Sequence, residues 1–228
     1  MDYVLVSGVV RDLHITQGYE DLANSTIFEK LSDDTEVQME FFRCFVDELQ
    51  TKGSFHRVDF REGETIDFVV TIYRGVGEVH GARNPSQHLI WTLPYRTRGH
   101  IAQKKHDISS SLNVSAIGAL LFAILAFSQE PGPLVECWPM ILKFATTAFW
   151  IILFVSYLAR RPFYKFSFEA TKIFSAFGFP DPATLNLPKR HNRADKDYSK
   201  ATGEPRSWDQ SWRYRYTFNI TSKTADDA

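Results

Sequence analysis

Two long apolar stretches near the middle of this chain constrain its fold more than any other feature. Residues 108–129 carry no formal charge, and residues 138–159 carry only Lys143, near the start of the stretch. At about 1.5 Å per residue each would form a helix of about 33 Å, enough to cross a bilayer core of roughly 30 Å. Buried helices of a soluble protein are the alternative, but neither stretch has the polar face that such helices present to water. The sequence therefore predicts a transmembrane helical hairpin over residues 108–160.

The residues that flank the two stretches predict how the hairpin lies in the membrane. Aromatic and basic side chains at membrane interfaces act as anchors, and we predict that role for five residues: Trp138, Tyr157, Arg160, Arg161 and Lys165. A basic linker at residues 93–107 precedes the first stretch, whereas the short connection EPGPLVEC carries only acidic charge. By the positive-inside rule, both termini are expected in the cytoplasm.

The chain offers few residues for targeting or for metal chemistry. Its first residues, MDYVLVSGVVRD, lack a basic and then apolar pattern, so no cleaved signal peptide is expected. Cys44 and Cys137 are the only cysteines, too few for a disulfide framework or a cysteine-based zinc site. We therefore expect no metal and no cofactor.

Residues 1–92 predict a small β-barrel. A first strand is expected over residues 3–15, with Gly8 at a bend, followed by a hairpin of residues 25–31 and 35–42. Residues 41–52 place Phe42, Phe45, Val46 and Leu49 at helical spacing, which predicts a short helix or a continuation into a loop. Two strands on either side of an Arg74–Gly75 turn and a last strand at residues 87–92 complete the set.

About five strands in some 90 residues are typical of a closed barrel of the OB kind. We expect six side chains of this barrel to face inward: Val4, Val6, Val10, Phe68, Val70 and Ile72.

Three sequence segments in this region resemble those of known proteins. VSGVVRDL, FREGETIDFVV and RGVGEVHGARN resemble the pattern of OB-like domains in bacterial membrane proteins of poorly defined function. The resemblance covers residues 1–92 and implies a fold but no catalytic residue, and the longer middle insertion at residues 41–60 departs from the pattern. Together with the hairpin, it implies an integral protein of the bacterial inner membrane.

The segment after the hairpin, residues 161–184, combines basic residues with many aromatic ones. Such a segment can lie in the cytoplasmic membrane interface or pack on the barrel. Residues 185–228 form a basic tail, and we expect residues 185–206 to be a linker because they are polar and contain Pro188, Gly203 and Pro205.

The tail ends in a strongly alternating pattern, WRYRYTFNIT, which predicts a strand over residues 212–221. A lone strand needs a partner, either the edge of its own barrel, a second copy or another protein. Its partner-binding candidates are Trp212, Arg213, Tyr214, Arg215, Tyr216 and Phe218. Opposite charges favour its own barrel, since residues 1–92 hold 16 acidic against 8 basic side chains and the remainder 11 against 18.

These features favour some functions over others. No HExxH, G-x-S-x-G or phosphate-loop motif occurs, so an enzyme is not expected and no catalytic residue is assigned. A membrane-tethered nucleic-acid-binding protein is a second alternative, suggested by the barrel type and the basic aromatic strand, but the acidic barrel would repel a phosphate backbone and only the tail could attract it. A membrane-perturbing effector that oligomerises through its hairpins would share every feature of an anchored scaffold.

The sequence thus predicts an α+β membrane protein with an OB-like β-barrel, a two-helix transmembrane hairpin and a basic aromatic tail with one strand. The expected function is that of a non-enzymatic binding or scaffold protein. The bilayer is its first partner, and the second is a protein, a small ligand or another copy of the chain.

Overall fold

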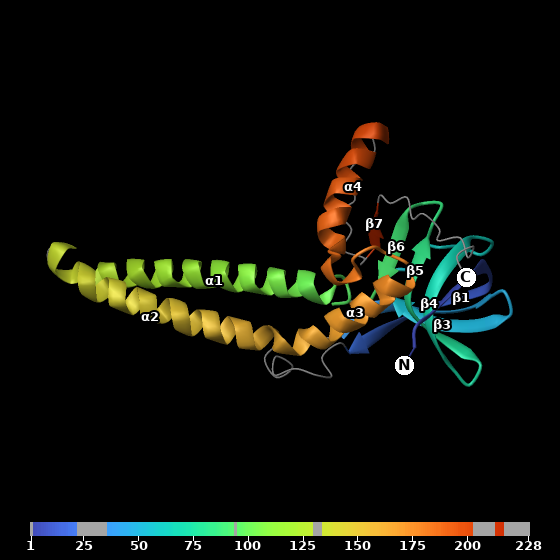
Figure 1. Ribbon diagram of the computed structural model, residues 1–228, viewed down its shortest axis with the longest axis horizontal. Helices are drawn as coiled ribbons and strands as arrows, with labels where there is room; N and C mark the ends of the chain where they lie inside the picture. The colour runs from blue at the N-terminus through green and yellow to red at the C-terminus, as the bar shows by residue number, and fades with distance from the viewer. Residues whose placement is uncertain (1, 22–35, 94, 130–133, 203–212, 217–228) are drawn as a thin grey trace. The chain divides into compact units, whose positions relative to one another are not determined.

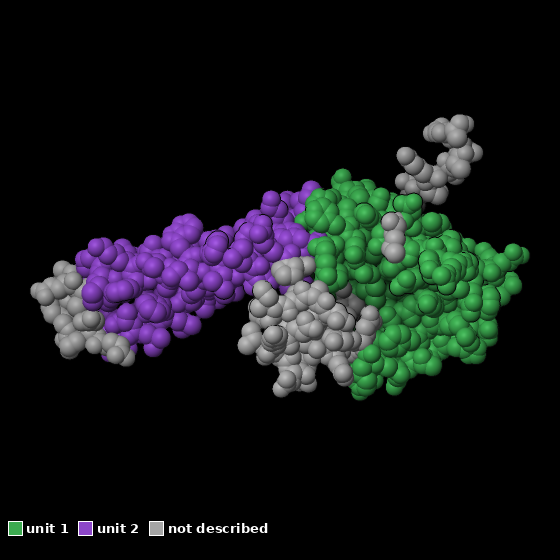
Figure 2. All heavy atoms as spheres, turned by 90° about the horizontal axis from the view of Figure 1, so that it is seen from below, with its two compact units in different colours: residues 1–100, 165–228 green, residues 101–164 purple. Residues whose placement is uncertain are grey.

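A computed structural model describes residues 2–21, 36–93, 95–129, 134–202 and 213–216 of the chain. The fold is mixed α and β, as predicted, and it divides into two compact units (Figure 2). The first consists of Met1–His100 with Lys165–Ala228, and the second of Ile101–Tyr164.

A seven-stranded sheet forms the first unit (Figure 1). Its strands are β1 (Val4–Asp21), β2 (Glu36–Val46), β3 (Leu49–Phe55), β4 (Thr65–Tyr73), β5 (Val76–Asn84), β6 (Leu89–Thr92) and β7 (Arg213–Arg215). They follow the order β3-β2-β1-β4-β5-β6-β7. A parallel pairing of β3 with β5 closes the first five strands into a barrel, which confirms the predicted closed barrel.

The barrel interior is filled by aromatic and branched side chains from all five strands. Of the six residues predicted to face inward, Val10, Phe68 and Val70 are buried in this core, and Val6 is half-buried against it. The prediction is wrong for Val4 and Ile72, which are exposed. Val4 begins β1 and Ile72 lies next to the end of β4, so both lie at strand ends, beyond the packed interior, although they share a strand face with the buried residues.

The helix predicted over residues 41–52 is absent, and β2 and β3 form a tight hairpin there instead. Asp47 has a positive φ of 53° and starts the two-residue turn that places Val46 opposite Leu49. Phe42, Cys44 and Val46 are buried at every second position, which is the period of a strand. The predicted partner strand at residues 25–31 lies outside the described residues.

A second hydrophobic core lies on the outside of the barrel, where α3 (Tyr164–Ala176) packs on the sheet. Its aromatic and branched side chains come from the segment predicted to be interfacial: Ile173, Phe174, Phe177 and Phe179. They contact Val69 and Ile90, so the interfacial interpretation is wrong for these four residues and packing on the barrel is the correct alternative. Burial in this core removes their apolar side chains from water more completely than a lipid interface would.

A buried ion pair fixes the same helix end to the barrel. Arg83 Nε lies 2.8 Å from the Asp67 carboxylate, and Arg83 Nη1 donates to the backbone carbonyl of Phe177 at 2.9 Å. Both charged side chains are buried, so the guanidinium satisfies the carboxylate and the carbonyl at once.

The predicted linker at residues 185–206 is also wrong, because α4 (Leu187–Thr202) occupies most of it. Asn186 Oδ1 accepts a hydrogen bond from the Lys189 backbone N–H at 3.1 Å, which caps the helix. Pro188 lies in the first turn, where a missing N–H costs nothing. Leu187 and Ala194 are buried, so α4 has an apolar side despite its polar composition.

The second unit is a helical hairpin of α1 (His100–Gln129) and α2 (Leu134–Arg160), followed by the short helix η2 (Arg161–Phe163). The two long helices lie side by side (Figure 1), and Gly118 packs so closely that a Cβ there would lie 2.6 Å from Ile152 Cδ1. Because α1 begins at His100, the predicted linker over residues 93–107 is helical in its second half. Both helices are long and apolar enough to cross a membrane.

Candidate binding groove on the barrel

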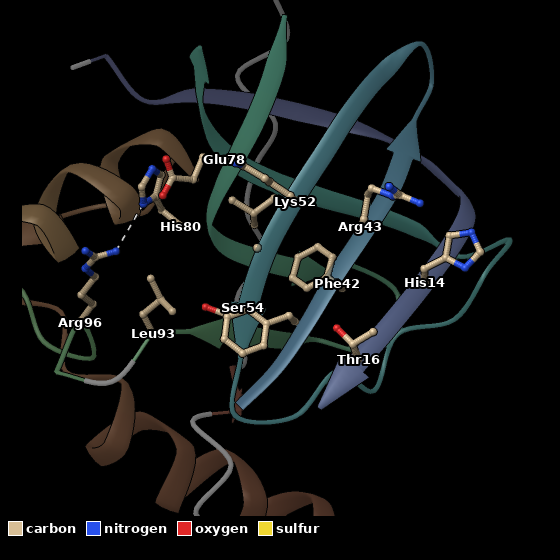
Figure 3. Close-up of a pocket in the computed structure, with 13 residues that line it drawn as sticks. His14, Thr16, Phe42, Arg43, Lys52, Ser54, Glu78, His80, Leu93 and Arg96 are labelled. Carbon is tan, nitrogen blue, oxygen red and sulfur yellow. Dashed lines mark hydrogen bonds between the residues drawn. The ribbon is translucent and has the colours of Figure 1, made fainter. Parts of the chain in front are cut away.

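A groove of about 710 Å³ lies on strands β1, β2, β3 and β5 (Figure 3). Its polar lining residues are exposed or half-buried, and Arg43 on β2 and Glu78 on β5 alternate with buried core residues, so these side chains belong to the face that points away from the barrel interior. Gly53 lies in its lining, and a side chain there would come within 2.9 Å of both Phe42 and Val79. Glycine therefore lets β3 lie directly on the core beneath the groove.

One row of charged side chains crosses the groove at right angles to the strands. His14 is the register partner of Arg43, Arg43 is the partner of Lys52, and Lys52 is the partner of Glu78. Four strands thus contribute one charged or titratable side chain each, and Figure 3 shows them in sequence across the sheet. Like charges directly opposite on neighbouring strands are destabilising, so the Arg43–Lys52 pair costs stability in the free protein.

The described residues do not neutralise these two cations. No carboxylate of a described residue forms an ion pair within 4.0 Å of Arg43 or Lys52. His14 Nε2 contacts Asp12 at 3.1 Å instead. The row therefore presents two cations side by side, with Glu78 at one end.

A second row lies two residues further along the strands. Thr16 is the partner of Phe41, and Phe41 is the partner of Ser54, so an aromatic ring lies between two hydroxyl-bearing side chains. The Phe41 ring also covers Gly18, where a Cβ would lie 2.8 Å from Phe41 Cε2. Phe41 remains 36% exposed, which leaves apolar ring surface open to the groove.

A connected group of polar side chains forms one wall of the groove. Arg96 lies 2.8 Å from the Glu169 carboxylate on α3 and 3.3 Å from His80 Nδ1. A guanidinium can only donate, so Nδ1 accepts and neutral His80 carries its proton on Nε2, which donates to Thr71 Oγ1 at 2.8 Å. Burial, and then the nearby Arg96 charge, lower the pKa of His80, which favours this neutral ring.

The five predicted membrane anchors are not brought together at one place. Trp138 is exposed on α2, and Tyr157 and Arg160 lie near the other end of that helix. Arg160 donates to Ser110 Oγ at 2.9 Å and lies 3.5 Å from the Asp107 carboxylate on α1. Lys165 belongs to the first unit, where its ammonium lies 4.8 Å from the Phe166 ring.

The predicted partner-binding strand pairs with its own barrel. Arg213, Tyr214 and Arg215 form β7 against β6, with Tyr214 opposite Ile90. Tyr214 and Tyr216 are buried in the second core, and Arg213 forms an ion pair with Asp59. The role of partner binding is therefore wrong for the two tyrosines, because their side chains are buried within the chain itself. Trp212 and Phe218 lie outside the described residues.

Sequence reasoning missed the groove because it placed a helix where β2 and β3 form a hairpin. A helix over these residues would not make Arg43 and Lys52 the cross-strand register partners that they are. The signal that could have found them is the Asp47–Glu48 turn, because a two-residue turn fixes Arg43 opposite Lys52.

Within the described part of the chain, no cluster of three or more His, Cys, Asp or Glu side chains is arranged to hold a metal ion. Comparison with known proteins found no matching family model, no matching curated protein and no matching solved structure.

Proposed function

We propose that this protein is a membrane-anchored, non-enzymatic binding protein. Its helical hairpin crosses the bilayer, and its barrel, an OB-like module, takes a ligand in the groove on β1, β2, β3 and β5. The barrel and both termini face the cytoplasm of a bacterial cell, with the hairpin in the inner membrane.

The exposed apolar surface of the hairpin carries this proposal. In the most apolar windows of His100–Ser128 and Trp138–Arg160, only 11% and 6% of the residues are buried. Large side chains such as Leu120, Leu125, Trp150 and Phe154 are exposed on both helices. Exposed apolar patches of this extent mark a membrane or protein interaction surface, and the length of both helices favours the membrane.

Two groups of polar residues in the hairpin support a spanning orientation. Asp107, Ser110 and Arg160 interact at one end, close to the basic residues that favour the cytoplasmic side. Ser115 turns its hydroxyl back to the Ser111 carbonyl at 2.7 Å, so this buried polar group is satisfied within its own helix.

Two features of the barrel support the binding part of the proposal. The pairing of β1 with both β2 and β4, closed by parallel β3 and β5, suits an OB-like barrel. The groove has a volume within the range of small-molecule sites and combines apolar and charged lining residues. A small ligand therefore suits it better than a flat protein surface.

The two natural cysteines allow a direct test of the topology. Cys44 is buried in the barrel, and burial raises the pKa of its thiol, so it should react slowly with maleimides. Cys137 lies near the start of α2, at the hairpin end that the proposal places outside the inner membrane. A membrane-impermeant maleimide added to intact spheroplasts should label the wild type but not Cys137→Ser, and labelling only after lysis would overturn the topology.

The binding role of the groove is tested separately by photo-crosslinking in living cells. A benzophenone amino acid replaces either Phe41 in the groove or Tyr73, an exposed residue at the end of β4. We expect an added mass, small molecule or protein, at position 41 only. Equal labelling at both positions, or none at position 41, would contradict a binding role for the groove.

A further inference from the structure

We infer that the groove binds a small organic phosphate whose phosphate group is attached to a planar ring system, the chemistry of a nucleoside monophosphate. This inference rests on the proposed function, which makes the groove the binding surface, and it identifies the class of ligand. The charged row, which runs from His14 to Glu78, binds the phosphate. The row of Thr16, Phe41 and Ser54 binds the ring.

The strand register places two cations where one anion can contact both. Arg43 and Lys52 are direct cross-strand partners, so their repulsion persists in the free protein. An anion between them turns this repulsion into two charge-assisted contacts, and a guanidinium can grip a phosphate with two parallel hydrogen bonds. Binding an anion there therefore stabilises the barrel as well as the ligand.

The neighbouring row, which contains Phe41, offers a surface on which a planar ring can stack. Phe41 lies two residues before Arg43 on β2, so the two side chains share a face and lie roughly 7 Å apart along the strand. A phosphate on Arg43 can then be joined to a ring that stacks on Phe41. The ring of Phe41 is held over Gly18, which fixes its orientation for stacking.

The remaining lining residues suit a ligand that carries hydroxyl groups. Glu78 places a carboxylate at the Lys52 end of the charged row, and Thr16 and Ser54 lie on either side of Phe41. A sugar between phosphate and ring can donate to the carboxylate of Glu78. A simple polyanion gains nothing from that carboxylate and is repelled by it.

A nucleic-acid strand fits the groove less well than a single nucleotide. Strand binding depends on many phosphate contacts, and the charged row supplies two cations without ion-pair partners among the described residues. The acidic excess of residues 1–92 opposes a polymer that extends beyond the groove. A single nucleotide has one phosphate and one ring, so it can contact both rows without extending over the acidic surface beyond the groove.

The test is a calorimetric titration of the full-length protein in a neutral detergent with adenosine 5′-monophosphate. Lys52→Gln and Arg43→Gln should each weaken binding about tenfold, as expected for the loss of one charge-assisted contact. Phe41→Leu should weaken it about tenfold as well, because the leucine keeps the apolar contact but removes stacking.

Arg61→Gln is the matched control, because it removes an exposed cation that does not line the groove. It should leave the affinity unchanged. Thermal unfolding without ligand separates binding from folding, since Arg43→Gln should have an unchanged or higher Tm once the like-charge pair is gone, because the register partners of Arg43 are Lys52 and His14 and neither is a carboxylate. A large drop in Tm in that variant would contradict the repulsion on which the inference depends.

Three other probes separate the sources of the same phosphate chemistry. Inorganic phosphate should bind at least tenfold more weakly than the nucleotide, and equal affinity would overturn the role of Phe41. The second probe is vesicles of phosphatidylcholine with phosphatidic acid, and the third is a single-stranded oligonucleotide. Neither should show a Lys52-dependent affinity higher than that of the nucleotide. If either does, the small-ligand inference is wrong.

The outcome for the nucleotide is distinguishable from the outcome for the proposed function. If adenosine 5′-monophosphate fails to bind but position 41 still forms a photo-adduct in cells, the groove is a binding site for another class of ligand. If neither occurs, both the inference and the binding role fail.

Discussion

The barrel and the hairpin use the same apolar amino acids in opposite ways. Phe42 in the barrel is 3% exposed and Ile66 is fully buried, whereas Phe154 and Ile124 of the hairpin are 64% and 54% exposed. The barrel therefore holds its apolar side chains inside and its charges outside, as water requires. The hairpin leaves most of its apolar side chains exposed, and both of its helices are long and apolar enough to cross a membrane.

Charged residues show the same contrast. The barrel unit buries the pair Asp67 and Arg83 between the sheet and the end of α3, where it joins two layers. In the hairpin, Asp107 and Arg160 interact at one end and leave the apolar middle without a charge. A buried charge pair is tolerated in the barrel because hydrogen-bonding groups surround it, which a lipid-facing helix cannot provide.

The sharpest test of this contrast places the same substitution in both units. Ile66→Asp puts a charge into the barrel core, at a cost of several kcal/mol against a total stability of about 5–15 kcal/mol, and should unfold the barrel. Ile151→Asp puts the charge on an exposed face of α2 near its middle. It should leave the barrel folded and cost about 2.5–3.5 kcal/mol of membrane insertion.

Circular dichroism of the detergent-solubilised protein reports the barrel, and alkaline carbonate extraction of membranes reports insertion. If Ile151→Asp changes neither measurement, the hairpin surface does not face lipid. If Ile66→Asp keeps the β-signal and melting of the wild type, the assigned barrel core is wrong.

A smaller effect distinguishes packing from membrane contact within α3. Phe174 is buried in the second core, whereas Phe168 on the same helix is 53% exposed and stacks on His100. Phe174→Ala should cost about 3–5 kcal/mol of stability, and Phe168→Ala about 1 kcal/mol. Thermal unfolding in detergent measures both, and equal effects would mean that α3 does not pack on the sheet as the structure shows.

The sequence predicted the β4–β5 turn, the last barrel strand and the two apolar helices, because each depends on a local pattern of residues. The Arg74–Gly75 turn has positive φ at both residues and joins β4 to β5 as predicted, and β6 lies within the predicted last strand. The two apolar stretches were equally clear, because their composition alone limits what they can contact.

The sequence misled where tertiary contacts determine the outcome. Phe42, Phe45 and Val46 fit a helical spacing by coincidence, and cross-strand pairing with β3 made them a strand. The aromatic residues after Pro162 looked interfacial because the sheet face that covers Phe174 cannot be identified from local pattern. The charged row of the groove depends on register between four strands, which no local window contains.

A third test probes how the two units use glycine. Gly118 lies on α1 where a Cβ would come within 2.6 Å of Ile152, so Gly118→Val should force α1 and α2 apart at a cost of about 1–3 kcal/mol. Gly75 in the β4–β5 turn has open space around it but a φ of 80°, so Gly75→Ala should cost about 1 kcal/mol through backbone strain. Gly118→Val should therefore weaken the hairpin and leave the melting of the barrel unchanged, which sodium dodecyl sulfate titration and thermal unfolding measure separately. A Gly118→Val variant with wild-type resistance to sodium dodecyl sulfate would contradict the close packing of α1 on α2.

The smallest expected effect appears only at alkaline pH and concerns the second core. Burial raises the pKa of Tyr216 to about 12, from 10.0 for a free tyrosine, because the phenolate would lose its water. Below pH 10 the side chain is neutral in both the folded and the unfolded state, so its contribution to stability is complete there. Between pH 10 and 12 the unfolded chain loses the proton first, and the stability of the barrel unit should fall as the pH rises.

Tyr216→Phe has no proton to lose, so its loss of stability across this window should be shallower than that of the wild type in urea titrations at fixed pH. Tyr73→Phe is the matched control, since Tyr73 is 68% exposed and its ring remains in water after folding. Equal slopes for wild type and Tyr216→Phe would show that the tyrosine hydroxyl is not enclosed by α3 and the sheet.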